Sequence, residues 1–444
     1  MNFEKTLRFI KEKTFKIFIF LLPTQLAYHF WPKWSHIYGV RVDYLAPTIY
    51  LTDLLIIVLL IVNAFEKIIF PNIKTVRNNR KKSNPFRKEV LLLFSLLIFS
   101  VINISTSEFL EVSVLKWVKF FELLFLSIYI INEKELNFKD WVGRPLSYSL
   151  IFFSIIAVLQ FFLKRTLGGF FYFLGERSFN ISTPGIALVD IFSQEYLRAY
   201  STFSHPNSLA GYYLVGLIII FNSSTRSFAN TKKLSLENKH KNNLLSIMVL
   251  IFSSCVLILT FSLGVWVAGL FVLTFFLISK NKAIFKKISL AFFLGIVSIS
   301  LLSPILFQRY FINRNLFKEN VSNRIELAKT AEKIYSQKPF FGIGLNNFII
   351  YLPKTSADTE VVWKFQPIHN IFLSILTETG LVGLLIFLYL LFLAFERTLK
   401  SNNIVLVLSL IAIIITGAFD HYWMTLQQNQ LLFSVVLGLS FRKK

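Results

Sequence analysis

The chain has 444 residues, of which 55% are hydrophobic, and its mean hydropathy is +0.60. A soluble domain of this length is not so apolar, so the composition predicts a membrane protein. The formal net charge of +23 would indicate nucleic-acid binding in a soluble protein. In a membrane protein it has a simpler cause, because Lys and Arg gather in cytoplasmic loops. No nucleic-acid partner is therefore expected.

Apolar runs that approach the length of a bilayer crossing recur along the chain and predict about twelve membrane helices. A single turn, Ser262–Leu263–Gly264, separates the seventh from the eighth. The expected fold class is an all-α polytopic membrane protein. The predicted spans are 17–30, 48–65, 90–107, 114–131, 146–163, 205–221, 243–261, 262–279, 288–307, 367–394, 403–418 and 424–440.

The distribution of basic residues predicts the orientation of these spans. With both termini in the cytoplasm, 30 of the 47 Lys and Arg residues fall on the inner side of the membrane and 15 on the outer side. The opposite orientation would place the eight basic residues of segment 66–88 outside, against the positive-inside rule. We therefore expect a multi-pass protein of the cytoplasmic (inner) membrane with both termini inside.

The spans divide the chain into three regions. Residues 1–307 form a bundle of nine spans, 308–366 a long extracytoplasmic loop, and 367–444 the last three spans. Within the loop, residues 323–337 are predicted to form a helix, with Asn323 as its cap and Glu326 completing a capping box. A long outer loop with its own helix is typical of a functional segment.

The first motif, Arg198-Ala-Tyr-Ser-Thr-Phe-Ser-His-Pro-Asn207, leads into the sixth span. Pro206 fits the first turn of a helix, so His205 and Asn207 either satisfy backbone groups at the helix start or contact substrate. Arg198 stays charged, and its forked guanidinium suits phosphate or carboxylate. Arg198 is therefore a candidate anion-binding residue, with His205 and Asn207 as candidate substrate contacts.

The second motif is Asn323–Arg324, followed by Lys329 on the same predicted helix. A cation near a helix N-terminus opposes the macrodipole, so Arg324 is expected to have an anionic partner. That partner is either a structural carboxylate such as Glu326 or a diphosphate, and we favour the diphosphate. Lys329 is a further candidate for substrate binding.

The third motif is Pro367-Ile-His369-Asn370, with Gly380 and Gly383 further along the same span. On a continuous helix the two glycines lie on the stripe of His369 and allow a neighbouring helix to approach closely. A titratable group at a membrane surface is a candidate functional residue. His369 is therefore the candidate base, and Asn370 a candidate substrate contact.

One candidate base and two permanent cations suit the attack of a hydroxyl on an anomeric carbon whose leaving group is a diphosphate. His369 would accept the hydroxyl proton, and Arg198 and Arg324 would stabilise the charge on the leaving group. The predicted outer segments contain no metal-ligand cluster and no phosphate-binding glycine loop. No metal and no cofactor are therefore expected.

The three blocks, together with Lys338-Pro-Phe-Phe-Gly-Ile-Gly-Leu-Asn-Asn-Phe348, resemble the O-antigen ligase and O-antigen polymerase superfamily in sequence and order. The resemblance covers about residues 198–383. It implies a fold like that of GT-C-type glycosyltransferases. It also implies a metal-independent, inverting transfer of a glycan from a polyprenyl-diphosphate carrier to a hydroxyl of a glycan, glycolipid or protein. By motif, the essential arginines of the family correspond to Arg198 and Arg324, and its catalytic histidine to His369.

One position departs from the family pattern. Leu263, in Thr260-Phe-Ser-Leu-Gly264, stands where many relatives have arginine, so this chain must do without that cation or supply it elsewhere. The ligase and polymerase activities are not separated by these motifs.

Other classes of protein remain as alternatives. A polysaccharide transporter or flippase would place charged residues along a central pathway, and a non-catalytic scaffold would not need the ordered motifs. A metal-dependent polyprenyl-phosphate sugar transferase would need an acidic pair early in an outer loop. The first outer loop has Asp43 alone.

Overall fold

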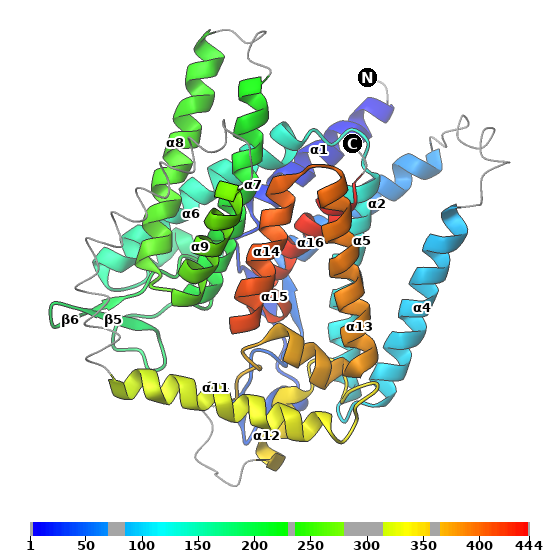
Figure 1. The fold of residues 1–444 in the computed structure, drawn as a ribbon, viewed down its shortest axis with the longest axis vertical. Coiled ribbons are helices and arrows are strands. Elements are labelled where there is room, and N and C mark those ends of the chain that lie inside the picture. Colours follow the sequence, from blue (N-terminus) through cyan, green and yellow to red (C-terminus); the bar gives the residue numbers. More distant parts are fainter. Residues whose placement is uncertain (1–2, 70–84, 230–235, 279–313, 356–364, 443–444) are drawn as a thin grey trace.

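The computed structural model describes residues 3–69, 85–229, 236–278, 314–355 and 365–442. Most of these residues form helices that run side by side as a bundle (Figure 1). The helices are α1 (Phe3–Phe20), α2 (Leu51–Ile69), α4 (Pro85–Ser105), α5 (Leu110–Asn132), α6 (Arg144–Leu163), α7 (Pro206–Ala229), α8 (Leu236–Leu259), α9 (Leu263–Ile278), α11 (Arg314–Tyr335), α12 (Phe348–Thr355), α13 (Ile371–Lys400), α14 (Ile404–Phe419), α15 (Tyr422–Thr425) and α16 (Gln427–Phe441).

Three antiparallel pairs of short strands also form, and the all-α prediction did not include them. Two of the pairs are joined by two-residue turns with left-handed backbone, Tyr38–Gly39 and Phe192–Ser193, which is the conformation that tight hairpins require. The pairs are β1 (Ala27–His29) with β4 (Thr48–Tyr50), β2 (His36–Ile37) with β3 (Val40–Arg41), and β5 (Leu188–Ile191) with β6 (Gln194–Leu197). The short helical turns are η1 (Lys33–Ser35), η2 (Phe138–Gly143) and η3 (Gly169–Leu174).

The described helices are consistent with an integral membrane protein, but they do not confirm the count of twelve spans. Two segments, Phe138–Leu163 and Ile371–Lys400, are long and apolar enough to cross a membrane. The predicted span 288–307 lies outside the described residues. The shorter apolar helices are Leu93–Ser105, Pro206–Ile220, Asn243–Leu259, Leu263–Leu277 and Ile404–Phe419.

The first predicted span, 17–30, is wrong. Helix α1 occupies Phe3–Phe20 instead, and the later part of the apolar run leads into strand β1. The basic stretch can enter the bundle because Lys11 pairs with Glu66 at 2.5 Å and with Glu133 at 2.8 Å. Paired charges of this kind are tolerated where an isolated charge is not.

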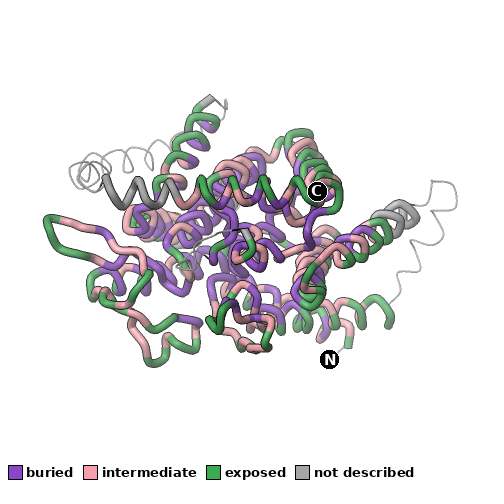
Figure 2. Tube along the Cα trace, turned by 90° about the horizontal axis from the view of Figure 1, so that it is seen from below, coloured by how far each residue is buried: buried purple, intermediate pink, exposed green. Residues whose placement is uncertain are grey.

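Buried residues concentrate in the centre of the bundle (Figure 2). The largest apolar cluster joins α1, α5, α6, α7, α14 and α16. Helix α11 lies across one end of the bundle, near α12, whereas the start of α1 lies at the opposite end (Figure 1). Leu327 and Ala331 of α11 share a second apolar cluster with Phe348 of α12. The predicted topology places the end that carries α11 outside the membrane, so it is called the outer end below.

Helix α11 begins at Arg314, so the prediction of a helix start at Asn323 is wrong. Asn323 lies inside the helix and does not cap it. The capping-box pattern misled because residues 314–322 contain no Gly or Pro and therefore nothing to stop a helix from continuing through them. The predicted end near Gln337 agrees with the observed end to within two residues.

Helix α13 is interrupted at Gly380, where the backbone has φ +70° and ψ −174°. The break lets residues 339–344 run alongside α13, and the N–H of Leu381 donates to the carbonyl of Pro339 at 2.8 Å. A side chain at Gly380 would collide with this neighbouring backbone. The predicted span 367–394 overlaps α13, which is long and apolar enough to cross a membrane, but the expectation of a continuous helix is wrong, because Gly380 admits a loop rather than a second helix.

The break is held by Asn103 of α4, whose side chain is fully buried. Its Nδ2 donates to the carbonyls of Phe341 at 2.7 Å and Glu378 at 2.8 Å. Its Oδ1 accepts from the N–H of Leu345 at 3.0 Å and from Nε1 of Trp117 at 2.9 Å. One amide thereby satisfies backbone groups that the interrupted helix and the loop would otherwise leave unpaired.

Candidate functional site

A cavity of about 1870 Å³ lies at the outer end of the bundle. Its walls come from segments far apart in the sequence, including α2, α5, the start of α7, the start of α9, α11 and the turn after α14. The structure brings most of the predicted site residues to this cavity. Those that line it are Arg198, His205, Asn207, Arg324 and His369.

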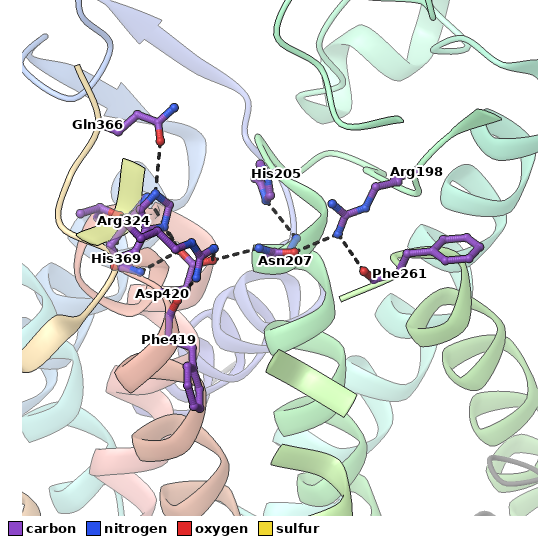
Figure 3. A network of polar contacts seen from close by, with 11 residues as sticks. Arg198, His205, Asn207, Phe261, Arg324, Gln366, His369, Phe419 and Asp420 are labelled. Atoms are coloured by element: carbon purple, nitrogen blue, oxygen red, sulfur yellow. Dashed lines mark hydrogen bonds and ion pairs between the residues drawn. The ribbon is translucent and has the colours of Figure 1, made fainter. Parts of the chain in front are cut away.

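Asp420, in the turn between α14 and α15, joins these side chains (Figure 3). Its Oδ2 accepts a hydrogen bond from Nδ2 of Asn207 at 3.0 Å, and Nη2 of Arg324 lies 3.9 Å from the same oxygen. Its Oδ1 lies 3.3 Å from Nδ1 of His369 and accepts from the N–H of His421 at 2.8 Å. One carboxylate therefore links three segments of the chain.

Arg198 is held in the cavity wall and is 7% exposed. Its Nε donates to the carbonyl of Thr260 at 2.7 Å, and its Nη2 donates to Oδ1 of Asn207 at 2.9 Å and to the carbonyl of Phe261 at 3.3 Å (Figure 3). These acceptors are neutral oxygens. The contacts therefore orient the guanidinium in the cavity wall.

Arg324 projects from α11, and its side chain is 40% exposed. Its Nη1 donates to the carbonyl of Phe419 at 2.7 Å (Figure 3). Its Nη2 lies 3.9 Å from Oδ2 of Asp420. The expected anionic partner is therefore a structural carboxylate, Asp420, and the binding of a diphosphate by Arg324 stays a prediction. The interpretation that Arg324 lies near a helix N-terminus is wrong, because α11 begins at Arg314.

Asn370 is the N-cap of α13. Its Oδ1 accepts from the N–H groups of Phe372 at 2.9 Å and Leu373 at 3.1 Å, which satisfies two donors that a helix start leaves unpaired. His369 therefore lies just before the helix, and the prediction that it shares a helical stripe with the glycines is wrong. The cap fixes His369 at the cavity wall.

The ring of His369 has a polar partner on each side. Nδ1 faces Asp420, and Nε2 lies 3.2 Å from Oε1 of Gln366 (Figure 3). A neutral ring that donates from Nδ1 to the carboxylate keeps its lone pair on Nε2. Gln366 can then turn its amide so that its N–H faces that lone pair, since the amide oxygen and nitrogen exchange by a flip. The side chain of His369 is 17% exposed.

The surroundings set the protonation of the neighbouring groups. Burial alone would raise the pKa of Asp420, but the hydrogen bond and charge of His369 lower it well below its ordinary value. Burial, and then the charge of Arg198, lower the pKa of His205 to about 3. Burial also lowers the pKa of His421 to about 3, against the charge of Asp420. A base with a pKa near 3 is a weak proton acceptor at neutral pH, so His369 is the better candidate base.

Residues 248–388 match the family model described as O-Antigen ligase. The match covers about a third of the chain and supports the resemblance to the O-antigen ligase and polymerase superfamily. A comparison with curated proteins found no match. The matched region includes Leu263, Arg324 and His369, whereas Arg198 and Asp420 lie on either side of it.

Two of the predicted substrate contacts lie away from the cavity wall. Lys329 is exposed on α11, and Asn370 serves as the helix cap. His205 has the structural role expected for the start of α7, since its Nδ1 accepts from the N–H of Asn207 at 3.1 Å. His205 also faces the cavity, so the two interpretations of this residue are compatible.

The sequence analysis missed Asp420 and His421. A signal for them was present, because both lie in the short segment between the predicted spans 403–418 and 424–440. The predicted topology places that segment on the outer side of the membrane. Two ionisable residues in so short a connection between membrane spans indicate a candidate functional site.

His369, Asp420 and His421 offer ligand atoms that lie within 4.8 Å of one another, as a metal site would. The guanidinium of Arg324 already faces Asp420, and a bound cation would be repelled by it. Nδ1 of His421 also lies 2.6 Å from Oγ1 of Thr425. Hydrogen bonds therefore account for the close approach of His369, Asp420 and His421. The expectation that the protein needs no metal stays a prediction.

Proposed function

We propose that this protein transfers a glycan from a polyprenyl-diphosphate carrier to an acceptor hydroxyl on the outer face of the cytoplasmic membrane. The acceptor is a glycan, a glycolipid or a protein, and the transfer is metal-independent and inverts the anomeric centre. The observation that carries the proposal is the convergence of His369, Arg198 and Arg324 on one cavity, joined through Asp420 and Asn207. The family match supports surface polysaccharide assembly in general.

In the proposed step, the acceptor oxygen attacks the anomeric carbon from the side opposite the diphosphate. The new carbon–oxygen bond forms as the bond to the diphosphate oxygen breaks, and the electron pair leaves with the polyprenyl diphosphate. The hydroxyl proton moves to Nε2 of His369. Arg198 and Arg324 stabilise the negative charge that gathers on the leaving group.

Asp420 is the positioning residue in this mechanism. Its hydrogen bond to Nδ1 fixes the ring orientation and keeps the lone pair of His369 on Nε2. Once the proton has moved, the ionised carboxylate stabilises the resulting imidazolium. The same logic of nucleophile, base and orienting acid operates in hydrolases, where the orienting acid need not accept the proton.

The proposal is tested with purified protein and a labelled lipid-linked glycan. His369→Ala should reduce transfer by about 10²–10⁴-fold, the range for a lost general base, while donor binding is retained through the arginines. His205→Ala is the matched control, and it should act mainly through the stability of α7. If His369→Ala keeps full activity while a folded His205→Ala variant is inactive, the base has been assigned to the wrong histidine.

A second experiment separates the ligase from the polymerase and tests the transporter alternative. The gene is deleted, and the surface glycans and the lipid-linked glycans are analysed on gels. Loss of attached glycan with retention of lipid-linked polymer indicates a ligase, whereas surface glycans of a single repeat indicate a polymerase. If the purified wild-type protein transfers no labelled glycan to any acceptor tested but moves it across vesicles, the transfer proposal is refuted.

A further inference from the structure

The loop that follows α6 exposes a cluster of large apolar side chains outside the cavity. It contains the short helix η3, whose sequence is Gly-Phe-Phe-Tyr-Phe-Leu and of which no residue is buried or lines the cavity. Phe170 is 69% exposed, Tyr172 60% and Phe173 64%. Neighbouring exposed rings of this size mark a surface that contacts a membrane or another protein.

The turn before η3 is tied to the bundle by the buried side chain of Glu176. Its Oε1 accepts from the N–H of Leu167 at 2.7 Å and from Nε2 of Gln160 at 2.6 Å. Its Oε2 accepts from the N–H of Gly168 at 2.7 Å. These donors compensate the carboxylate for its lost hydration. Because Gln160 lies in α6, the turn is fixed to that helix.

The other end of η3 is held as closely. Oγ1 of Thr24 donates to the carbonyl of Leu174 at 2.6 Å. Gly175 follows with φ +88°, and a side chain there would collide with the backbone of Gln25. With both ends tied to neighbouring segments, the exposed rings of η3 are presented at a defined position beside α6.

The position of η3 relative to α6 indicates what covers these rings. Helix α6 belongs to one of the two segments that are long and apolar enough to cross a membrane, and the predicted topology places its last turn at the outer surface. Phe162 and Leu163 of that turn are exposed. Residues 164–169 alone separate Leu163 from Phe170. The apolar surface of the span therefore continues into η3.

The charges of this segment suit a lipid surface. Residues 162–175 include Lys164 and Arg165 and no acidic residue. Arg165 is exposed, and Nζ of Lys164 lies 4.1 Å from the centre of the Tyr196 ring. Aromatic rings at the end of a membrane span occupy the level of the headgroups, and basic side chains there keep their charge in the polar layer. The composition therefore favours lipid over a protein partner.

We propose that η3 is a membrane anchor of the outer loop and inserts into the outer leaflet. The rings of Phe170, Tyr172 and Phe173 lie where the headgroups meet the acyl chains, and Lys164 and Arg165 contact lipid phosphates. The same loop continues to residues 185–190, which line the cavity. Insertion of η3 thereby sets the height of this part of the cavity wall above the bilayer.

Spin labelling tests the insertion in full-length protein, reconstituted in nanodiscs that each hold one copy. Cys255, the one cysteine of the chain, is first replaced by serine. Labels are then attached to cysteines that replace Phe170 or Phe173. Phe162→Cys is the reference for lipid, and Ser182→Cys, on an exposed polar turn of the same loop, is the reference for water.

The labels at 170 and 173 should be reached by oxygen rather than by a water-soluble nickel complex. Their ratio of oxygen to nickel accessibility should exceed that at 182 several-fold and approach that at 162. Shielding cannot come from a second copy, since each disc holds one. Labels at 170 and 173 that are as accessible to nickel as the label at 182, in variants with normal thermal unfolding, would overturn the proposal.

A charge placed among the rings tests whether they act as an anchor. Phe173→Asp should move the label at 170 into water, because an ionised carboxylate is costly among acyl chains. Ser182→Asp is the matched control and should leave the label at 170 unchanged. Tyr172→Asp replaces Phe173→Asp should that variant not fold. A label at 170 that stays immersed beside the aspartate would overturn the anchor role. No substrate is present, so neither measurement depends on the proposed transfer.

Discussion

Replacing Asp420 by Asn tests the proposed mechanism at its central contact. The substitution keeps the size of the side chain and can still accept from the N–H of His421. It removes the charge that faces His369 at 3.3 Å. The asparagine amide can also donate to Nδ1, which would move the ring proton to Nε2 and remove the lone pair that accepts the substrate proton.

The structure indicates that the effect on the base, His369, should exceed the effect of losing the ion pair between Asp420 and Arg324. Loss of a general base costs about 10²–10⁴-fold in rate, or roughly 2.7–5.5 kcal/mol of transition-state free energy. The contact of Asp420 with Arg324 is longer, at 3.9 Å, and the arginine is 40% exposed. Such a pair is worth about 1 kcal/mol at most. The effect should therefore fall on kcat, and the KM for the donor should change by less than about fivefold.

The assay is steady-state transfer of a labelled lipid-linked glycan by purified protein, with donor and acceptor varied separately. Thermal unfolding of the same preparations establishes that the variant is folded. A folded Asp420→Asn variant with the kcat of the wild type would refute the reasoning, because the carboxylate would then have no part in setting the state of His369.

Four further predictions follow from the site and the topology. Arg324→Lys should lose most activity although the charge is kept, because an ammonium cannot bind two diphosphate oxygens as a fork; near wild-type turnover would count against bidentate binding. Activity should survive a divalent-metal chelator, and inhibition that added metal reverses would favour a metal site. Stability should fall as the pH is lowered from about 6.5 toward 3, since the pKa of His421 is about 3 in the folded protein and about 6.5 when exposed, so the unfolded chain binds more protons in this window. The loss is up to about 1.4 kcal/mol per pH unit, and thermal unfolding at pH 7.5 and 5 should show a smaller difference for His421→Asn. Reporter fusions after Lys82 and after Lys354 should report opposite sides of the membrane, the second outside; the same side for both would contradict the topology.

The positions of most helices could be predicted, because a long apolar run in the sequence indicates a helix locally. The helices from α2 to α9 and the last helices of the chain agree with the predicted runs in the described regions, including the turn at Ser262. The break in α13 could not be predicted in the same way. It depends on hydrogen bonds to residues 339–344 and to Asn103, which lie far from Gly380 in the sequence.

The candidate site could be predicted only as single residues with suitable side-chain chemistry, and not as a set of contacts. Arg198, Arg324 and His369 were found because charged residues next to membrane spans are conspicuous, and all three line one cavity. Asp420 contacts Arg324 and His369 and is linked to Arg198 through Asn207. It was missed because tertiary packing brings these residues together. No pattern in the sequence predicts that residue 420 contacts residues 207 and 369.

The broken helix α13 also bears on how the reacting groups respond to the membrane. The part of α13 before Gly380 is tied by backbone and Asn103 contacts to the loop and to α4. The part after it is joined to the first through a single non-helical residue, and its first turn also contacts the loop, where the N–H of Leu381 donates to the carbonyl of Pro339. When bilayer thickness changes, a membrane helix adapts by tilting, and this joint allows the inner half to tilt alone. We therefore expect the height of His369 above the lipid to be set by the protein rather than by the thickness of the bilayer around it.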